Sequence, residues 1–268
     1  MRQRWAARGD VRLPYVVQGP DDGRRLVYAH GIHGSGAVAR DSVAPLLERG
    51  WTIATFDQRG HHRATPVRDA RDYDPGEMGA DLIAVMDALG WTDAWIGGES
   101  MGAATSMAAA CSTPERVRGL LQVVPAICER PLAVADNFSA MADVLDRDGI
   151  EATIALMTAE IERLGGKQSQ IDRLADLRLH DPSSIALAWR TVPTWVMSGI
   201  VGRLAAFGFP VLVAGWRDEP VHPFGIAEEF AASARHGVLV ELSLEDWLEN
   251  RSTIGRAIAD PLDAVCGA

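Results

Sequence analysis

The sequence has few of the features that mark secreted, membrane or nucleic-acid-binding proteins. No apolar run among its 268 residues is long enough to span a bilayer, and the N-terminal segment lacks the apolar stretch of a secretory signal. Lys and Arg number 26 against 36 Asp and Glu, so no basic excess is present to neutralise the phosphates of a nucleic acid. We therefore expect a cytoplasmic protein that acts on a small molecule, with no nucleic-acid or membrane partner.

Cysteine is scarce as well. Cys111, Cys128 and Cys266 are odd in number and have none of the short spacings of a zinc site. We expect reduced thiols rather than a disulfide framework or a metal centre.

The pattern that is present is one of short apolar runs alternating with helical segments, which is typical of βαβ units on a parallel sheet. The predicted strands lie at residues 25–30, 51–57, 94–99, 119–125, 210–216 and 237–243. The clearest helix is "PGEMGADLIAVMDALG" (75–90), in which apolar side chains recur at helical spacing. Residues 11–19 are expected to be part of an antiparallel edge of the sheet. We predict an α/β fold, with a mostly parallel sheet and helices on both of its faces.

Residues 126–209 interrupt this alternation. The segment has no convincing strand, but apolar residues from Ile150 to Leu164 repeat at helical spacing. Ordinary packing helices would give the same pattern. Because the strands on both sides end at loops with candidate chemistry, we predict a helical cap at 126–209 on a core domain formed by 1–125 and 210–268.

A serine flanked by glycines stands between a predicted strand and a predicted helix, in "GESMG" (98–102). Such a Gly-x-Ser-x-Gly turn lifts the serine hydroxyl out of the sheet, and only small neighbours fit around its strained backbone. The N–H of the following residue, Met101, would face a developing oxyanion. We predict that Ser100 is a nucleophile rather than a simple helix cap.

A second glycine-rich loop, "AHGIHGSG" (29–36), follows the first parallel strand. Its sharp turns would aim the Ile32 N–H at the space above Ser100, as the second donor of an oxyanion hole. His30 is expected to be structural. His33 lies in the same loop near the predicted site. We interpret it more simply as a loop residue than as a catalytic base.

Four motifs occur in the order and spacing of the α/β-hydrolase superfamily, which the chain resembles over nearly its whole length, cap included. They are "HG" (30–31), "FDQRGH" (56–61), "GESMG" (98–102) and "PVLVAGWRDEPVHP" (210–223). The resemblance implies an α/β-hydrolase fold, and the first half is similar to enol-lactonases and esterases. The family's DxRGxGxS loop differs here, because His62 and Ala64 replace its last glycine and serine, so we expect this loop to differ in conformation or contacts.

The resemblance also implies a catalytic acid after the strand at 210–216, where Asp218 stands, and a histidine base after the last strand. No histidine follows His236, and His236 precedes that strand. Trp247 stands roughly where the imidazole is expected, and an indole ring has no basic nitrogen. The usual C-terminal catalytic histidine of the family is therefore absent.

One interpretation is that the base has moved to His222, on a loop that should reach the same sheet edge as Ser100. Its carboxylate partner would be Asp218, or Asp246 in the last loop if acid and base have exchanged places. Such an exchange is acceptable because a triad is recognised by geometry and not by chain order. The simpler reading is that His222 only caps the helix that begins near Pro223.

Two other interpretations dispense with an acyl-enzyme. The chain could be a cofactor-free lyase, isomerase or cyclase, in which an oxyanion hole stabilises an enolate and a histidine moves protons. The candidate histidines for this role are His33, His61, His62 and His222. Alternatively, the protein binds a ligand at a catalytically dead site, since fold resemblance alone does not decide function.

We favour an enzyme that hydrolyses a small ester, lactone or related carbonyl compound, with no metal or organic cofactor. Ser100 would attack the carbonyl, and His222 would act as general base and then as general acid. The remaining expected site residues are Asp218 or Asp246 as the orienting carboxylate, Ile32 and Met101 as oxyanion donors, and His33, Glu99 and His62 as possible substrate contacts.

Overall fold

The computed structural model describes residues 2–217 and 219–267. Within these residues, eight strands form one sheet in the order β1-β2-β4-β3-β5-β6-β7-β8. The strands are β1 (Arg4–Arg8), β2 (Val11–Gln18), β3 (Arg24–Ala29), β4 (Trp51–Phe56), β5 (Ala94–Glu99), β6 (Val117–Val123), β7 (Val211–Gly215) and β8 (Gly237–Glu241). β2 is antiparallel to both β1 and β4, and every other neighbouring pair is parallel. The predicted α/β class with a mostly parallel sheet is confirmed.

The antiparallel edge of the sheet agrees with the prediction. Residues 11–19 were expected to belong to such an edge, and β2 lies within them and is antiparallel to both β1 and β4. The outermost strand, β1, was not predicted. The short and mostly exposed pattern of β1 gives little apolar periodicity for a sequence prediction.

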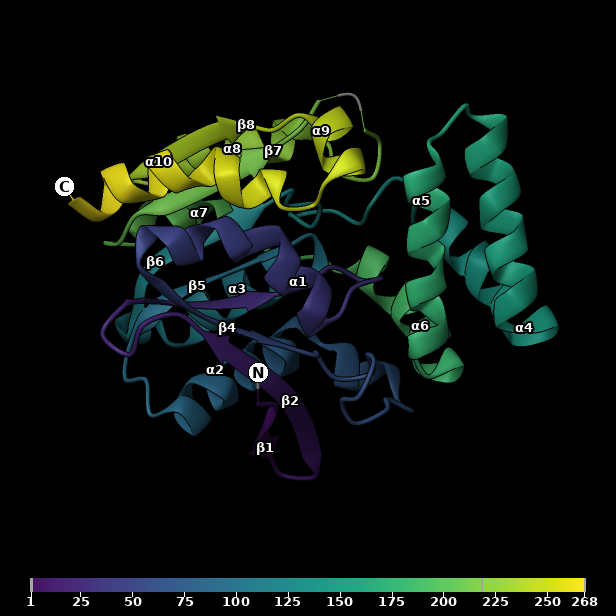
Figure 1. The fold of residues 1–268 in the computed structure, drawn as a ribbon, viewed down its shortest axis with the longest axis horizontal. Helices are drawn as coiled ribbons and strands as arrows, with labels where there is room; N and C mark the ends of the chain where they lie inside the picture. The colour runs from purple at the N-terminus through teal and green to yellow at the C-terminus, as the bar shows by residue number, and fades with distance from the viewer. Residues whose placement is uncertain (1, 218, 268) are drawn as a thin grey trace.

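Helices cover both faces of the sheet (Figure 1). The α-helices are α1 (Gly36–Val43), α2 (Pro75–Leu89), α3 (Met101–Ser112), α4 (Ala135–Arg163), α5 (Gln168–Arg173), α6 (Pro182–Thr191), α7 (Ile200–Ala206), α8 (Phe224–Ser233), α9 (Leu244–Glu249) and α10 (Thr253–Gly267). Short 3-10 helices lie at Ala44–Arg49, Ala70–Tyr73, Pro114–Arg116, Leu174–Leu179 and Val192–Thr194. No helix within the described residues is long and apolar enough to cross a membrane.

Successive side chains along a strand belong alternately to two apolar clusters, one on each face of the sheet. In β3, Val27 and Ala29 belong to the cluster under α2, α3 and α8, whereas Leu26 and Tyr28 belong to the cluster under α1 and α10. This alternation follows from the two-residue period of a strand. It explains why β3 reads as a continuous apolar run, since a parallel sheet covered on both faces buries every side chain.

Between β6 and β7 the described chain is helical and contains no strand. Helices α4, α5 and α6 stand to one side of the sheet (Figure 1). Helices α4 and α6 and the 3-10 helix that follows α5 enclose their own apolar cluster, which includes Leu145, Leu177 and Trp189. Helix α7 behaves differently, because Ile200 and Leu204 join the core cluster of the sheet. The predicted cap segment, which ends at residue 209, therefore includes α7, a helix that packs with the core.

Candidate active site

Ser100 lies at the junction between β5 and α3 with a backbone conformation that L-residues rarely adopt, φ 54° and ψ -113°. Its N–H donates to the Val123 carbonyl at 3.0 Å, which ties the turn to the neighbouring strand. A Cβ at Gly98 would collide with the backbone of Gly102, and a Cβ at Gly102 would collide with the Ala29 carbonyl. The two glycines are therefore needed where strand, turn and helix pack backbone to backbone.

His222 reaches Ser100 from the loop between β7 and α8. Its Nε2 lies 2.9 Å from Ser100 Oγ, and its Nδ1 contacts a carboxylate oxygen of Glu219. The Glu219 carboxylate also accepts from the backbone N–H groups of Val221 at 2.9 Å and His222 at 3.0 Å. Burial raises the pKa of Glu219, but hydrogen bonding and attraction to His222 outweigh it, so this pKa lies below its usual range. The loop thus presents an oriented imidazole to the serine hydroxyl.

The carboxylate beside His222 is not one of the two that the sequence suggested. Asp218 lies outside the described residues. Asp246 is exposed in the first turn of α9, where its N–H donates to Ser243 Oγ. Glu219 occupies the place beside His222 Nδ1, because the tight turn at 219–222 brings residues three apart into contact. That spacing was the available signal for Glu219, and the family pattern directed attention to Asp218 instead.

Trp247 does lie near the site, as part of a stack of side chains. Its ring centroid is 4.9 Å from that of Trp216, and the Trp216 ring meets the edge of His222 at 5.8 Å. On the other side, the Arg173 guanidinium carbon lies 4.6 Å from the centre of the Trp247 ring. The indole therefore supports the imidazole through packing while the histidine comes from another loop.

The loop after β3 brings Ile32 and His33 to the serine. His30 is buried and structural in its contacts, since its Nε2 accepts from the Gln58 N–H at 3.0 Å. The loop turns sharply at Gly34, whose N–H donates to the Gly31 carbonyl at 2.9 Å. Burial lowers the pKa of His61, and its Nε2 lies 2.9 Å from the Ile32 carbonyl. These contacts hold the loop in place over Ser100.

Two cavities meet at Ser100, and Ile32, His33 and His222 line both. The smaller, of about 180 Å³, also includes Met101 and is otherwise lined mainly by apolar residues, among them Ile127, Leu132, Phe138 and Val192. The larger, of about 260 Å³, is also lined by Gln170, Arg173, Trp247 and Arg251. The serine hydroxyl therefore stands between an apolar space and a space that contains two guanidinium groups.

His33 and Glu99, both predicted as substrate contacts, line the larger cavity. The His33 ring packs edge-on against Trp189 at 5.5 Å, and burial lowers its pKa to about 4, so the ring is neutral at pH 7. Glu99 is buried beside the serine and accepts from Ser42 Oγ at 3.3 Å. Burial raises the pKa of Glu99, although the nearby Arg251 charge acts in the other direction.

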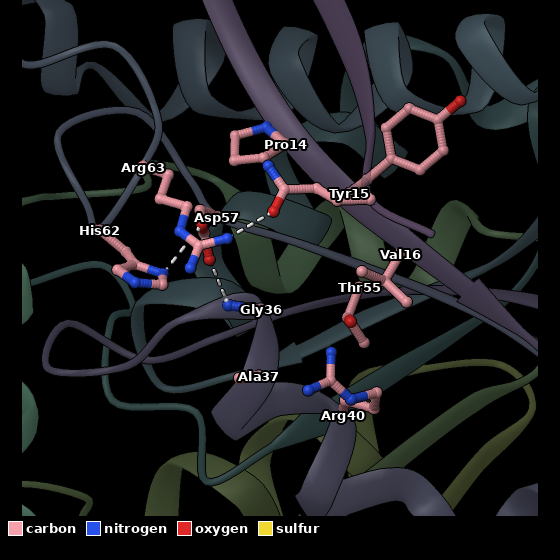
Figure 2. A pocket seen from close by; sticks show the side chains of 11 residues that line it. Pro14, Tyr15, Val16, Gly36, Ala37, Arg40, Thr55, Asp57, His62 and Arg63 are labelled. Carbon is pink, nitrogen blue, oxygen red and sulfur yellow. Dashed lines mark hydrogen bonds and ion pairs between the residues drawn. The ribbon is translucent and has the colours of Figure 1, made fainter. Parts of the chain in front are cut away.

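His62, the third predicted contact, lines a different cavity of about 270 Å³ (Figure 2). Its Nδ1 lies 3.1 Å from Asp57 Oδ2, while Asp57 Oδ1 accepts from the Gly36 N–H at 2.7 Å. His62 has φ 48°, in the region that normally favours glycine, which is the residue of the family pattern at this position. The replacement keeps a glycine-like backbone and changes the contacts, and it turns this side chain away from the cavities at Ser100.

The sequence pattern of the family described as alpha/beta hydrolase fold matches residues 24–152. A candidate carbamate hydrolase, RutD of Variovorax paradoxus (strain S110), is 27% identical over 223 residues, which cover 82% of this chain and 83% of RutD. Among solved structures, a hydrolase from Pseudomonas aeruginosa PA01 has a TM-score of 0.80 at 22% identity, covering 99% of this chain and 98% of the other. The enol-lactonase from Burkholderia xenovorans LB400 has a TM-score of 0.77 at 18% identity, covering 99% and 100%. The matched segment and the shared architecture confirm the predicted α/β-hydrolase fold.

Proposed function

We propose that the protein is a serine hydrolase that cleaves a small ester, lactone or related carbonyl compound. The observation that carries the proposal is the 2.9 Å contact between His222 Nε2 and Ser100 Oγ, with Glu219 beside the other ring nitrogen. A serine hydroxyl is a weak nucleophile at neutral pH, and a positioned histidine is the usual way to activate it. Relatives named as a carbamate hydrolase and an enol-lactonase support a hydrolase, because both names imply attack on a carbonyl group.

In the proposed reaction, His222 Nε2 takes the hydroxyl proton as Ser100 Oγ bonds to the substrate carbonyl carbon. The carbonyl oxygen gains the electron pair, and the backbone N–H groups of Ile32 and Met101 stabilise it. His222 then gives its proton to the leaving oxygen as the bond to that oxygen breaks, which leaves an acyl-enzyme. Water, deprotonated by His222, attacks the acyl-enzyme and releases the acid and the free serine. Glu219 stabilises the imidazolium formed in both steps.

The apolar cavity beside Ser100 supports a substrate with a hydrophobic portion. Phe138 comes from α4 and Val192 from the 3-10 helix after α6, so the segment between β6 and β7 supplies part of the wall. Apolar, partly enclosed pockets suit apolar ligand groups. We therefore keep the cap as part of the proposal, limited to the segment that contains α4, α5 and α6.

The main reason to consider a non-hydrolytic enzyme or a binding protein was that no histidine base follows the last strand. An imidazole at hydrogen-bond distance from the serine removes that argument. It favours acyl transfer over an enolate reaction, in which the serine would need no base.

Labelling with a fluorophosphonate tests the proposal, because the reagent modifies serines that a base activates. We expect a single adduct at Ser100, with no labelling of Ser100→Ala and at least a 100-fold slower reaction of His222→Ala. Ser112→Ala is the matched control, since Ser112 lies at the end of α3 and bonds only to the helix carbonyl of Ala109. Unchanged labelling of the Ser100 or His222 variant would contradict a serine hydrolase.

A further inference from the structure

The larger cavity at Ser100 is bordered by hydrogen-bond donors that have no acceptor. Arg173 Nη1 and Trp247 Nε1 are buried and lack a hydrogen-bond partner within the described residues, and so does His33 Nε2. All three residues line this one cavity. Arginine and tryptophan nitrogens can only donate, and a buried donor without an acceptor costs free energy. Such a cluster requires an explanation, and a ligand rich in acceptor oxygens provides one.

The protein fixes Arg173 in position without neutralising it. Its Nη2 donates to the backbone carbonyls of Trp247 at 2.7 Å and Leu248 at 2.9 Å, so two contacts of the guanidinium are with neutral groups. Burial, followed by the nearby Arg251 charge, lowers the pKa of Arg173, and the weaker attraction to Glu99 and Asp176 acts in the other direction. An anion at the free Nη1 edge would supply the missing acceptor and the missing charge.

Other charges near the cavity have partners. Arg251 Nη1 lies 3.6 Å from Asp176 Oδ2, which partly neutralises it. The Glu99 carboxyl already accepts from Ser42 Oγ and from the Gly31 N–H. Arg173 is therefore the cation at this cavity that has a buried nitrogen without a partner among the described residues.

We propose that this cavity binds a carboxylate of the substrate, so that the carbonyl presented to Ser100 belongs to a molecule with an acid group at one end. The inference rests on the proposed function and names its substrate class: monoesters or lactones that carry a free carboxylate. The planar guanidinium edge matches the two oxygens of a carboxylate, and the apolar cavity on the other side of Ser100 takes the opposite portion of the molecule.

Paired synthetic esters test this assignment. The probes are 4-nitrophenyl monoesters of adipic and pimelic acid. Each is compared with the mixed diester in which the free carboxylic acid of the same compound is converted to a methyl ester. These chains are long enough to limit attack of the acid on its own ester. We expect kcat/KM for the acid to exceed that for the methyl ester by about 10- to 100-fold, the effect of hydrogen bonds to a charged group. A ratio near one in the unaltered enzyme would overturn the inference and leave the proposed function standing.

Arg173→Gln removes the charge and keeps a donor for the Trp247 or Leu248 carbonyl. We expect its acid-to-ester ratio to fall to within about threefold of one, with Arg173→Lys in between because it lacks the planar fork. Arg178→Gln is the matched control: Arg178 belongs to the same segment, is exposed and pairs with Glu151. If Arg173→Gln does not fold, the lysine variant decides. An unchanged ratio in the variant tested would overturn the assignment.

Binding separates this inference from the proposed reaction. Adipate should bind the Ser100→Ala protein, measured by calorimetry, and lose at least tenfold in affinity when Arg173→Gln or Arg173→Lys is added. If no ester is hydrolysed but this binding and its loss are seen, the carboxylate site stands and the hydrolase proposal fails. Absence of adipate binding to Ser100→Ala would overturn the carboxylate site.

Discussion

Glu219 holds His222 by the ring and by the main chain at once. The carboxylate contacts Nδ1, accepts from the N–H groups of Val221 and His222, and lies 3.5 Å from the indole nitrogen of Trp216. A carboxylate with this many donors stays ionised and fixes the ring tautomer, so that Nε2 is free to accept the serine proton. At the scale of single residues, the proposed serine nucleophile depends on this turn for its proposed base.

Replacing Glu219 with glutamine tests that dependence. Glu219→Gln should lower kcat/KM by about 100- to 10,000-fold, because a neutral amide stabilises the imidazolium less and can select the wrong tautomer. Steady-state hydrolysis of a 4-nitrophenyl ester measures the loss. Asp246→Asn is the matched control and should change kcat/KM by less than about twofold, since Asp246 is exposed on α9. A large loss in the Asp246 variant with little in the Glu219 variant would reverse the assignment.

Sequence reasoning found the serine and the histidine of the candidate site but missed its carboxylate and Arg173. Ser100 was predictable because its flanking glycines are required locally by the turn. Glu219 had only its three-residue spacing from His222 as a signal, and the turn that joins the two was needed to give it meaning. Arg173 had no signal, because its place depends on the contact between the end of α5 and Trp247 in α9. A periodic pattern carries no information about such pairings between segments.

At the scale of elements, the β5–α3 junction depends on glycine. The helix starts immediately after Ser100, and the close approach of Gly102 to the Ala29 carbonyl leaves no room for a methyl group. The parallel strands of the sheet were predictable from their apolar runs. The packing of α7 against the core was not predictable, because a short amphipathic helix has the same sequence pattern whether it packs on the sheet or on other helices.

Gly102→Ala should destabilise the protein and disturb the serine. Overpacking of a tight site typically costs about 1–3 kcal/mol in the free energy of unfolding, and here the strain falls on the turn that carries Ser100. Chemical denaturation measures the stability, and fluorophosphonate labelling measures the serine. Gly208→Ala serves as control, since a Cβ there meets nothing within 4 Å. Equal stabilities of the two variants would contradict the steric account of the junction.

At the scale of the whole molecule, three of the seven histidines are buried and a fourth is partly buried in one region between the sheet edge and the helical segment. They are His30, His33, His61 and His180, and the rings of His30 and His180 each pack edge-on against His61. Burial is the largest cause of a lowered pKa in each, to about 4 for His33 and about 3 for His180. The fold therefore keeps this group neutral where an unfolded chain would protonate it.

This arrangement predicts that the protein loses stability as the pH falls below about 6.5, the ordinary histidine pKa. Between that value and the lowered folded-state values, the unfolded chain binds more protons, so protonation favours unfolding; His180 alone contributes roughly 2 kcal/mol of loss by pH 5. Glu99, with its raised pKa, acts in the opposite direction, but it is one group against four. The free energy of unfolding, measured by denaturant titration at pH 7 and pH 5, should fall accordingly.

His180→Asn isolates one member of the group. Asparagine can still accept from the His62 N–H, which His180 Nδ1 accepts at 3.0 Å, but it does not titrate. The variant should lose less stability than the unaltered protein between pH 7 and pH 5, by roughly the 2 kcal/mol assigned to this ring. His236→Asn is the control, because His236 is exposed and lies far along the chain from the cluster, just before β8. If His180→Asn kept the full pH dependence, His180 would not be a source of it, and the acid sensitivity would have to come from the other three histidines or from the carboxylates.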